Sequence, residues 1–191
     1  MIFSKRKSIG TSGQDILINF LSQHFGYSFL AGERNEKIVN PEIIEELEGC
    51  EYVLPKTTYP NSSGAKLKFV RDEKEYLLTC PDLFMSRNNT EKHYWIEVKT
   101  HTKNDTRIII DKDNFDDYAT LYTKFTRQNF YVMCWNPINE NFWNVYWCEF
   151  GKLLSKIPIR QTLGNNSVYV WEMSDVMVKL NRYPINIKNY V

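Results

Sequence analysis

Hydrophobic residues recur at the three- and four-residue spacing of a buried helix face in two parts of this chain. The first stripe predicts a helix from about residue 12 to residue 25. The second predicts a helix from residue 113 or 114 to about residue 128, with Tyr118 among its buried positions. A shorter helix is predicted at residues 41–49, because Asn40 can cap it and a proline occupies its first turn.

Alternating hydrophobic and polar positions, or short apolar runs, predict strands between these helices. The predicted strands cover residues 66–70, 75–79, 130–135, 142–150 and 168–171, with a last helix at residues 174–180. The run at 130–135 is apolar throughout and follows a helix, which is typical of a buried strand parallel to an earlier one. Together these elements predict an α/β fold in which helices flank a mixed β-sheet.

The chain contains no linker that would separate a second domain. We therefore expect a single domain over residues 1–191, in line with the usual size of a domain. Its core would span about residues 10–150, and residues 151–191 would form an appendage on that core.

Two neighbouring apolar segments carry the candidate chemistry. Asp82 opens the first, and after a polar turn at residues 87–91 the second contains Glu97 and Lys99. Because side chains alternate along a strand, Glu97 and Lys99 point to the same face, and Asp82 on the paired strand can turn onto that spot. Two carboxylates and a lysine around one point suit metal-assisted phosphodiester hydrolysis. Carboxylate oxygens hold Mg²⁺, and the lysine stabilises an attacking hydroxide.

Pro81, Asp82, Glu97 and Lys99 match the short motif of the PD-(D/E)XK nuclease superfamily, and the region resembles those proteins. The superfamily includes restriction enzymes, Holliday-junction resolvases and phage nucleases. The resemblance implies a restriction-endonuclease-like mixed sheet with the core order αβββαβ. It implies that Asp82, Glu97 and the backbone carbonyl of Val98 bind Mg²⁺, for which Mn²⁺ can substitute, while Lys99 positions the attacking water. The implied activity is a metal-dependent endonuclease on DNA, with RNA as an alternative substrate.

Members of this superfamily often carry a further acid on the first helix. The matching position here is Gln14, which we expect to face the cleft as an additional catalytic residue. Gln14 shares the buried side of the predicted helix with Leu17 and Leu21, whereas Asp15 falls on the polar side. A glutamine brings no charge, so the resemblance does not extend to a tightly held second metal. Asp15 and Glu33 are the fallback acids.

Four basic residues are candidates for contact with substrate phosphate. His101 and Lys103 directly follow the strand that carries Lys99, so a loop there would border the cleft. Lys124 and Arg127 lie on the polar face of the second long helix, where they can reach a nucleic-acid backbone. The plainer interpretation of these residues is a solvated loop and a solvated helix face.

The overall composition limits the kind of partner. A formal net charge of +1 does not indicate nucleic-acid binding by the whole surface, so any such surface must be local. The four cysteines lack metal-ligand spacing and fit buried, reduced thiols. Since the chain shows neither an apolar signal core nor an apolar run of ~20 residues, we expect a cytoplasmic protein without a membrane partner. A homodimer is an open alternative, because cutting two strands commonly needs two copies.

Two other functions are alternatives to a metal-dependent nuclease. A catalytically silent nucleic-acid-binding module on a nuclease-like scaffold would keep its binding after changes at Asp82, Glu97 or Lys99. A non-enzymatic interaction protein that matches the motif by chance would not bind divalent metal. The presence of all three residues favours the enzyme, because a silent module has no evident need for the complete set.

Overall fold

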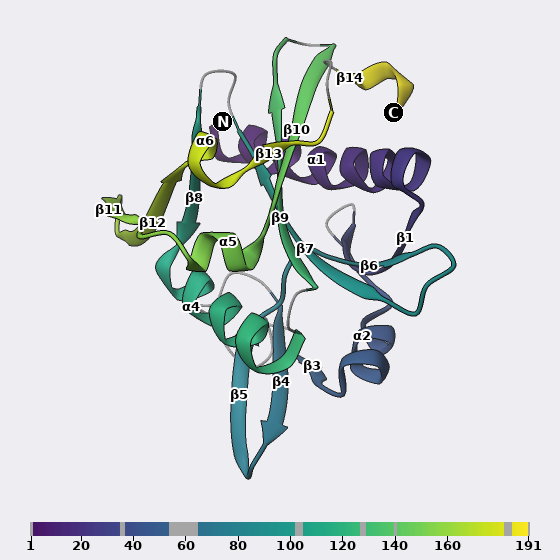
Figure 1. Cartoon of the computed structure of the whole chain (residues 1–191), viewed down its shortest axis with the longest axis vertical. Helices are drawn as coiled ribbons and strands as arrows, with labels where there is room; N and C mark the ends of the chain where they lie inside the picture. Colours follow the sequence, from purple (N-terminus) through teal and green to yellow (C-terminus); the bar gives the residue numbers. More distant parts are fainter. Residues whose placement is uncertain are drawn as a thin grey trace.

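A mixed β-sheet forms the centre of the structure, and helices lie against both of its faces (Figure 1). The computed structural model describes residues 2–34, 37–53, 65–101, 105–126, 129–139, 141–181 and 185–190. The sheet has eight strands in the order β13-β10-β9-β7-β6-β1-β2, with β14 also paired to β10. β7 and β9 are parallel, and the other pairings described in this sheet are antiparallel. The predicted fold class, α/β with a mixed sheet flanked by helices, is confirmed.

Distant parts of the chain meet in this sheet. Its strands are β1 (Tyr27–Arg34), β2 (Lys37–Val39), β6 (Leu83–Arg87), β7 (His93–Thr100), β9 (Phe130–Pro137), β10 (Phe142–Glu149), β13 (Val178–Lys179) and β14 (Ile185–Asn186). The two principal helices against it are α1 (Ile2–Phe25) and α4 (Lys112–Leu121). The chain passes through α1, β1, β6, β7, α4 and β9 in turn, which is the order αβββαβ.

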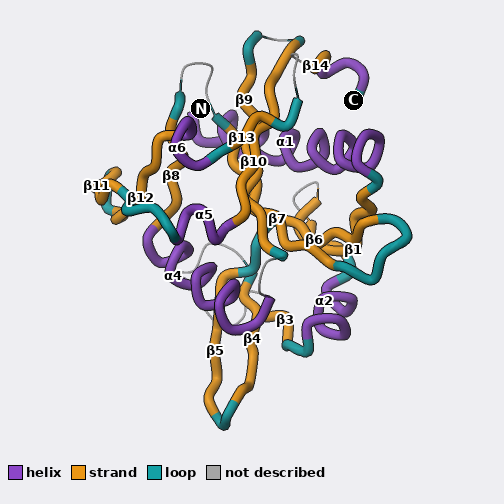
Figure 2. The backbone as a smooth tube through the Cα atoms, in the orientation of Figure 1, coloured by secondary structure: helices purple, strands orange, loops and turns teal. Residues whose placement is uncertain are grey.

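The two faces of the central sheet are covered by different helices. Successive side chains of a strand point to opposite faces, so β7 sends Ile96 to one side and Glu97 to the other. Ile96 packs in a core with Leu17 of α1. Trp95, on the same face as Glu97, packs in a second core with Phe130, which also includes residues of α4 and α5 (Phe150–Leu154). The backbone trace shows α1 and α4 apart from each other, with β7 and β9 between them (Figure 2).

Two three-stranded sheets extend from the central one. The first contains β3 (Glu51–Val53), β4 (Lys66–Arg71) and β5 (Lys74–Thr79), and the second contains β8 (Arg107–Asp111), β11 (Ile159–Leu163) and β12 (Asn166–Glu172). The hairpin of β4 and β5 projects beyond the rest of the molecule (Figure 1). The remaining elements are α2 (Pro41–Glu48), α6 (Met173–Val176), the π-helical turn η1 (Tyr122–Thr126) and the 3-10 turn η2 (Ile187–Asn189).

Asp117 of α4 joins this helix to the base of the β4–β5 hairpin. Its Oδ2 accepts hydrogen bonds from Lys66 Nζ at 2.9 Å, from Thr79 Oγ1 at 2.7 Å and from the Thr79 backbone N–H at 2.9 Å. One carboxylate therefore ties both strands of the hairpin to the helix that covers the Glu97 face.

Most predicted strands are confirmed, but one core strand was missed. The strands predicted at residues 66–70, 75–79, 130–135, 142–150 and 168–171 correspond to β4, β5, β9, β10 and β12, and β9 is parallel to β7 as expected. β1 is the first strand of the core, and Gly32, Glu33 and Arg34 break the apolar alternation that would have revealed it. The β4–β5 hairpin belongs to a separate sheet.

The predicted helix bounds need three corrections. α1 begins at Ile2, well before the predicted start, because a capping residue favours a helix start but does not force one. α4 ends at Leu121 and continues as η1, while residues 127 and 128 lie outside the described part of the chain. The helix predicted at residues 174–180 is wrong. α6 is a single helical turn. The next residues, which include the β-branched Val178, form β13, and this strand pairs with the edge of β10.

The helices of the described part of the chain also bear on membrane association. None of them combines the length and the apolar character that crossing a membrane would need.

Gly32 is the backbone position that holds Asp82 in place. Its φ is +123°, where only glycine is unstrained, and a Cβ there would collide with the carbonyl oxygen of Asp82. We expect Gly32→Ala to lower the free energy of unfolding, measured by urea denaturation, by about 3 kcal/mol, because backbone strain and overpacking act together. Gly49→Ala is the matched control. Gly49 has a φ of +64° with nothing within 4 Å of the added Cβ, so strain alone should cost about 1 kcal/mol. Equal losses in the two variants would contradict this account.

Candidate active site

Asp82 is held beside β7 by a hydrogen bond to the backbone. It precedes β6, whose pairing with β7 stops at Leu83 and Ile96. The next N–H of β7 that faces this side belongs to Val98, and Asp82 Oδ2 accepts a hydrogen bond from it at 2.7 Å. The N–H and C=O of one strand residue face the same neighbour, so the Val98 carbonyl also points towards the Asp82 side.

Glu97 is a buried carboxylate with both of its oxygens engaged. It is 4% exposed. Lys99 Nζ donates to Oε1 at 2.6 Å, and the Tyr118 hydroxyl of α4 donates to Oε2 at 2.8 Å. Lys99 is two residues along the same strand, so strand alternation alone brings it to Glu97. Its side chain is 25% exposed, so Lys99 is partly open to solvent.

The two carboxylates open onto one cavity of about 410 Å³. Residues of β1, β2, β3, β5, β7 and α4 line it, so it lies between the Glu97 face of the central sheet, the sheet of β3 to β5, and α4. Its polar lining includes Glu33, Tyr52, Thr79, Asp82, Glu97 and Asn114. Asp82, Glu97 and Lys99 therefore lie together, as expected. Asp82 and Glu97 line the same cavity, and Lys99, which does not line it, donates a hydrogen bond to Glu97.

The charges in this site favour the binding of a cation. Burial, followed by the nearby negative charge of Glu97, raises the pKa of Asp82 well above its usual value. Burial by itself would lower the pKa of Lys99, but the carboxylates of Glu97 and Asp82 outweigh it and raise that pKa. Burial and then the Glu97 charge raise the pKa of the Tyr118 phenol, which stays a hydrogen-bond donor. Two carboxylates this close are costly to keep ionised unless another positive charge is present.

The donor set fits a hard divalent cation such as Mg²⁺. Mg²⁺ is usually held by one or two carboxylates and completes its shell with water. Asp82 and Glu97 supply the carboxylates, and the Val98 carbonyl supplies a third oxygen on the same side. In the described residues, no three His, Cys, Asp or Glu side chains are grouped to hold an ion. A bound cation would thus rely on backbone and water oxygens for its remaining ligands.

Gln14 does not take the place that the sequence predicted. Its side chain is buried, at 8% exposure, as predicted from its position on the apolar side of the helix. However, α1 covers the Ile96 face of the sheet, and Gln14 is not among the residues that line the cavity of Asp82 and Glu97. Its neighbour Asp15 accepts a hydrogen bond from Arg34 Nε at 3.0 Å and does not simply face solvent. Of the two fallback acids, Glu33 lines the cavity.

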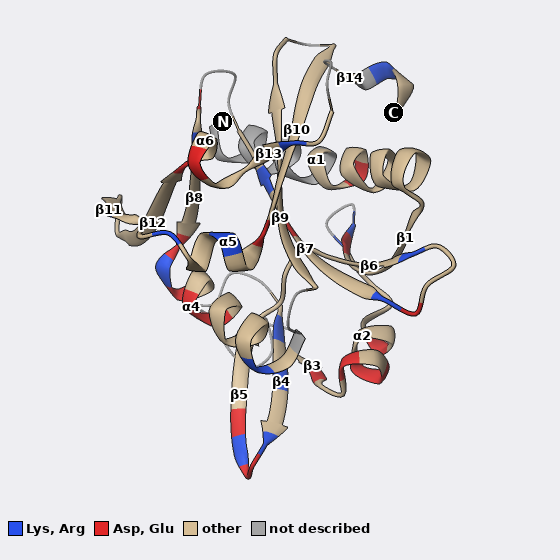
Figure 3. Ribbon diagram, viewed as in Figure 1, with Lys and Arg blue, Asp and Glu red and all other residues tan. Residues whose placement is uncertain are grey.

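The four basic residues that were predicted to contact phosphate differ in their exposure. His101 is buried at 8% exposure, and burial lowers the pKa of its imidazole, so it is not the exposed loop residue that we expected. Lys124 is exposed, with its Nζ 5.2 Å from the ring centre of Tyr76. Lys103 and Arg127 lie outside the described residues. Acidic and basic residues are interspersed along the ribbon, and α2 is strongly acidic (Figure 3).

Tyr118 and Tyr52 are the two site residues that sequence analysis missed. The helical stripe did place Tyr118 on a buried face, but it gave no sign that its hydroxyl would reach Glu97. Tyr52 lies in β3, a strand of only three residues that the sequence did not predict. A buried tyrosine next to carboxylates was the available signal, because a buried phenol usually has a hydrogen-bond partner.

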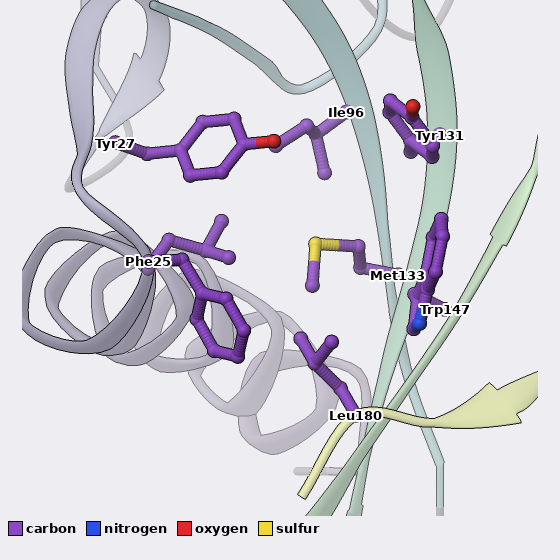
Figure 4. Close-up of a pocket in the computed structure, with 8 residues that line it drawn as sticks. Phe25, Tyr27, Ile96, Tyr131, Met133, Trp147 and Leu180 are labelled. Carbon is purple, nitrogen blue, oxygen red and sulfur yellow. The ribbon is translucent and has the colours of Figure 1, made fainter. Parts of the chain in front are cut away.

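A second cavity, of about 240 Å³, lies on the opposite face of the sheet. Figure 4 shows Phe25 and Tyr27, at the end of α1 and the start of β1, facing Met133 and Trp147 across it. Its lining is almost entirely apolar and contains no carboxylate, lysine or histidine. This second cavity therefore offers none of the charged groups on which the candidate chemistry depends.

Similarity to known proteins is found among solved structures. No protein-family model matches the sequence, and no curated protein matches it. Among solved structures, the chain is similar to Hjc of Archaeoglobus fulgidus, a Holliday junction resolvase from an archaeal hyperthermophile. The two share 15% identity with a TM-score of 0.34, and the match covers 73% of this chain and 86% of that one. At this level of similarity, the assignment of a function rests on the site residues themselves.

The raised pKa of Asp82 predicts a pH-dependent stability in the metal-free protein. The folded state binds this proton more tightly than the unfolded chain, whose aspartate has a pKa of about 3.9. Protonated Asp82 therefore contributes its full stabilisation below the unfolded-state pKa. This stabilisation is lost as pH rises through the pKa of Asp82 in the folded protein. Asp82→Asn cannot ionise and keeps an oxygen for the Val98 N–H. We expect it to be more stable than the parent at pH 8, by a margin that shrinks towards pH 4.

Urea denaturation across this pH range, in the presence of a chelator, measures that margin. A margin that does not change with pH would mean that Asp82 titrates normally in the folded protein.

Proposed function

We propose that this chain is a metal-dependent nuclease of the PD-(D/E)XK superfamily that hydrolyses phosphodiester bonds, with DNA as its substrate and internal bonds as its targets. The observation that supports this most is the convergence of Asp82, Glu97 and Lys99. Asp82 accepts a hydrogen bond from the backbone N–H of Val98, the residue after Glu97. Lys99 donates a hydrogen bond to the Glu97 carboxylate itself. This arrangement provides hard oxygen ligands and a preplaced cation at one point.

Asp82, Glu97 and the Val98 carbonyl would hold Mg²⁺ or Mn²⁺. When bound, the metal would lower the pKa of water and polarise the phosphate. Lys99 would hold the attacking water and stabilise the negative charge that develops on the phosphate in the transition state. Tyr118 keeps Glu97 oriented through its hydrogen bond to Oε2. Gln14 is not among the residues that line this cavity, and an additional catalytic role for it stays a prediction from the sequence.

Substrate contacts would be local, in keeping with the net charge of +1. Lys124 is exposed and is proposed to contact backbone phosphate. Lys103 and Arg127 are kept as proposed phosphate contacts from their place in the sequence. Cleavage of both strands of a duplex would require two copies of the chain, because each copy offers one such site.

Substitutions at Lys99 and Asp82 separate catalysis from metal binding. Lys99→Ala should cut turnover by about 100-fold or more, since it removes a preplaced charge from the transition state, while DNA binding and Mg²⁺ binding persist. Asp82→Ala should lose Mg²⁺ binding and turnover together. Cleavage of plasmid, single-stranded and four-way-junction DNA, and of RNA, would be followed in Mg²⁺ or Mn²⁺. Affinity would be measured at one salt concentration, because phosphate contacts are salt-dependent.

Lys156→Ala is the matched control, because Lys156 is exposed and does not line the cavity. It should cleave like the parent. Parental rates in Lys99→Ala would remove Lys99 from the mechanism. A parent protein that binds nucleic acid but cleaves none of these substrates would instead identify a silent binding module.

A further inference from the structure

One polar atom in the cavity of Asp82 and Glu97 has no hydrogen-bond partner in the described part of the chain. This atom is the buried hydroxyl oxygen of Tyr52, which lines the cavity. Buried polar groups in folded proteins are almost always hydrogen-bonded, and an unpaired one lowers stability. A hydroxyl held in this way beside a cavity is explained if a molecule that enters the cavity supplies the missing partner.

Glu33 provides a second polar group near Tyr52. Glu33 and Tyr52 both line this cavity. Glu33 is fixed to the site through its backbone N–H, which donates to the carbonyl oxygen of Asp82 at 2.8 Å. Its carboxylate does not complete a three-residue metal group within the described part of the chain. It is therefore available to accept a hydrogen bond from a ligand.

The cavity combines these polar groups with flat and apolar walls. Ile38, Ala65 and Pro81 line it, and so does Tyr118. A volume of about 410 Å³ is in the range of small-molecule sites. A cavity that is lined by apolar side chains and by hydrogen-bonding groups in similar measure suits a planar ring with a polar edge. A nucleobase is such a ring, and a base stacked in a duplex cannot enter a cavity of this kind until it leaves the stack.

We infer that this cavity receives the base of an unpaired nucleotide next to the phosphate that a metal at Asp82 and Glu97 would hold, and that Tyr52 and Glu33 bind the edge of this base. This inference rests on the proposed nuclease function and narrows its substrate to DNA with unpaired nucleotides at the cut. Because Glu33 accepts hydrogen bonds only, bases that present an exocyclic amine, such as cytosine, should be favoured over thymine.

Tyr52→Phe tests the role of the hydroxyl with the smallest change. It removes one oxygen that has no hydrogen-bond partner among the described residues, so the melting temperature of the variant should be equal to or higher than that of the parent. Cleavage of a single-stranded oligonucleotide should nevertheless fall about fivefold, the effect of one lost hydrogen bond. Tyr131→Phe is the matched control. Tyr131 lines the apolar cavity on the opposite face, so this variant should cleave like the parent.

A scan with single abasic nucleotides locates the base that enters the cavity. One position near the cut should lower parental cleavage about tenfold, and Tyr52→Phe should cause no further loss on that substrate. The parental preference for cytosine over thymine at that position should disappear in Glu33→Gln, because an amide can also donate. This ratio is insensitive to a general loss of activity.

The outcomes distinguish this inference from the nuclease proposal. A parent that cleaves every abasic substrate as fast as the intact one would overturn the base pocket and leave the nuclease assignment standing. An equal loss in Tyr52→Phe on intact and abasic substrates would do the same. A parent that cleaves no nucleic acid would remove the nuclease proposal, and the inference with it.

Discussion

The burial of the Glu97 carboxylate is the constraint around which this site is built. A buried charge is very costly unless it is paired and hydrogen-bonded, so the fold must bring donors to both of its oxygens. Lys99 comes from the same strand and Tyr118 from α4, at 2.6 Å and 2.8 Å. The first contact follows from strand alternation. The second requires α4 to lie over this face of the sheet, so the local site depends on the packing of a separate element.

The position of α4 depends in turn on the residue next to Tyr118. Asp117 accepts three hydrogen bonds from Lys66 and Thr79, which fixes the helix to the base of the β4–β5 hairpin. Thr79 also lines the cavity that contains Glu97. On the other side, β1 contributes the Glu33 N–H to the Asp82 carbonyl. The hairpin, α4 and β1 thus form the walls of the cavity, and the same contacts hold its carboxylates in place.

Sequence periodicity predicted the local part of this arrangement and missed the parts that depend on tertiary packing. Alternation was enough to place Glu97 and Lys99 on one face, because both lie on a single strand. The helical stripe also showed correctly that Gln14 is buried, but periodicity does not tell which face of a sheet a helix will cover, and α1 covers the face opposite Glu97. Glu33 was only a fallback because its strand contains Gly32 and two charged residues. Tyr118 was recognised as buried, but its polar partner comes from an element far away in the sequence.

The free protein keeps several groups in this cavity at a cost to its stability. Burial, followed by the nearby charge of Glu97, raises the pKa of Asp82 well above normal, and the buried Tyr52 hydroxyl has no hydrogen-bond partner among the described residues. In the same cavity, the hydroxyl and the N–H of Thr79 are both hydrogen-bonded to Asp117, so the fold does satisfy other buried polar groups there. Polar or charged groups that a fold leaves at a cost to its stability tend to occur at functional sites. Both such groups line one cavity, and under the proposed function a bound cation would answer the first and a hydrogen-bonding ring would answer the second.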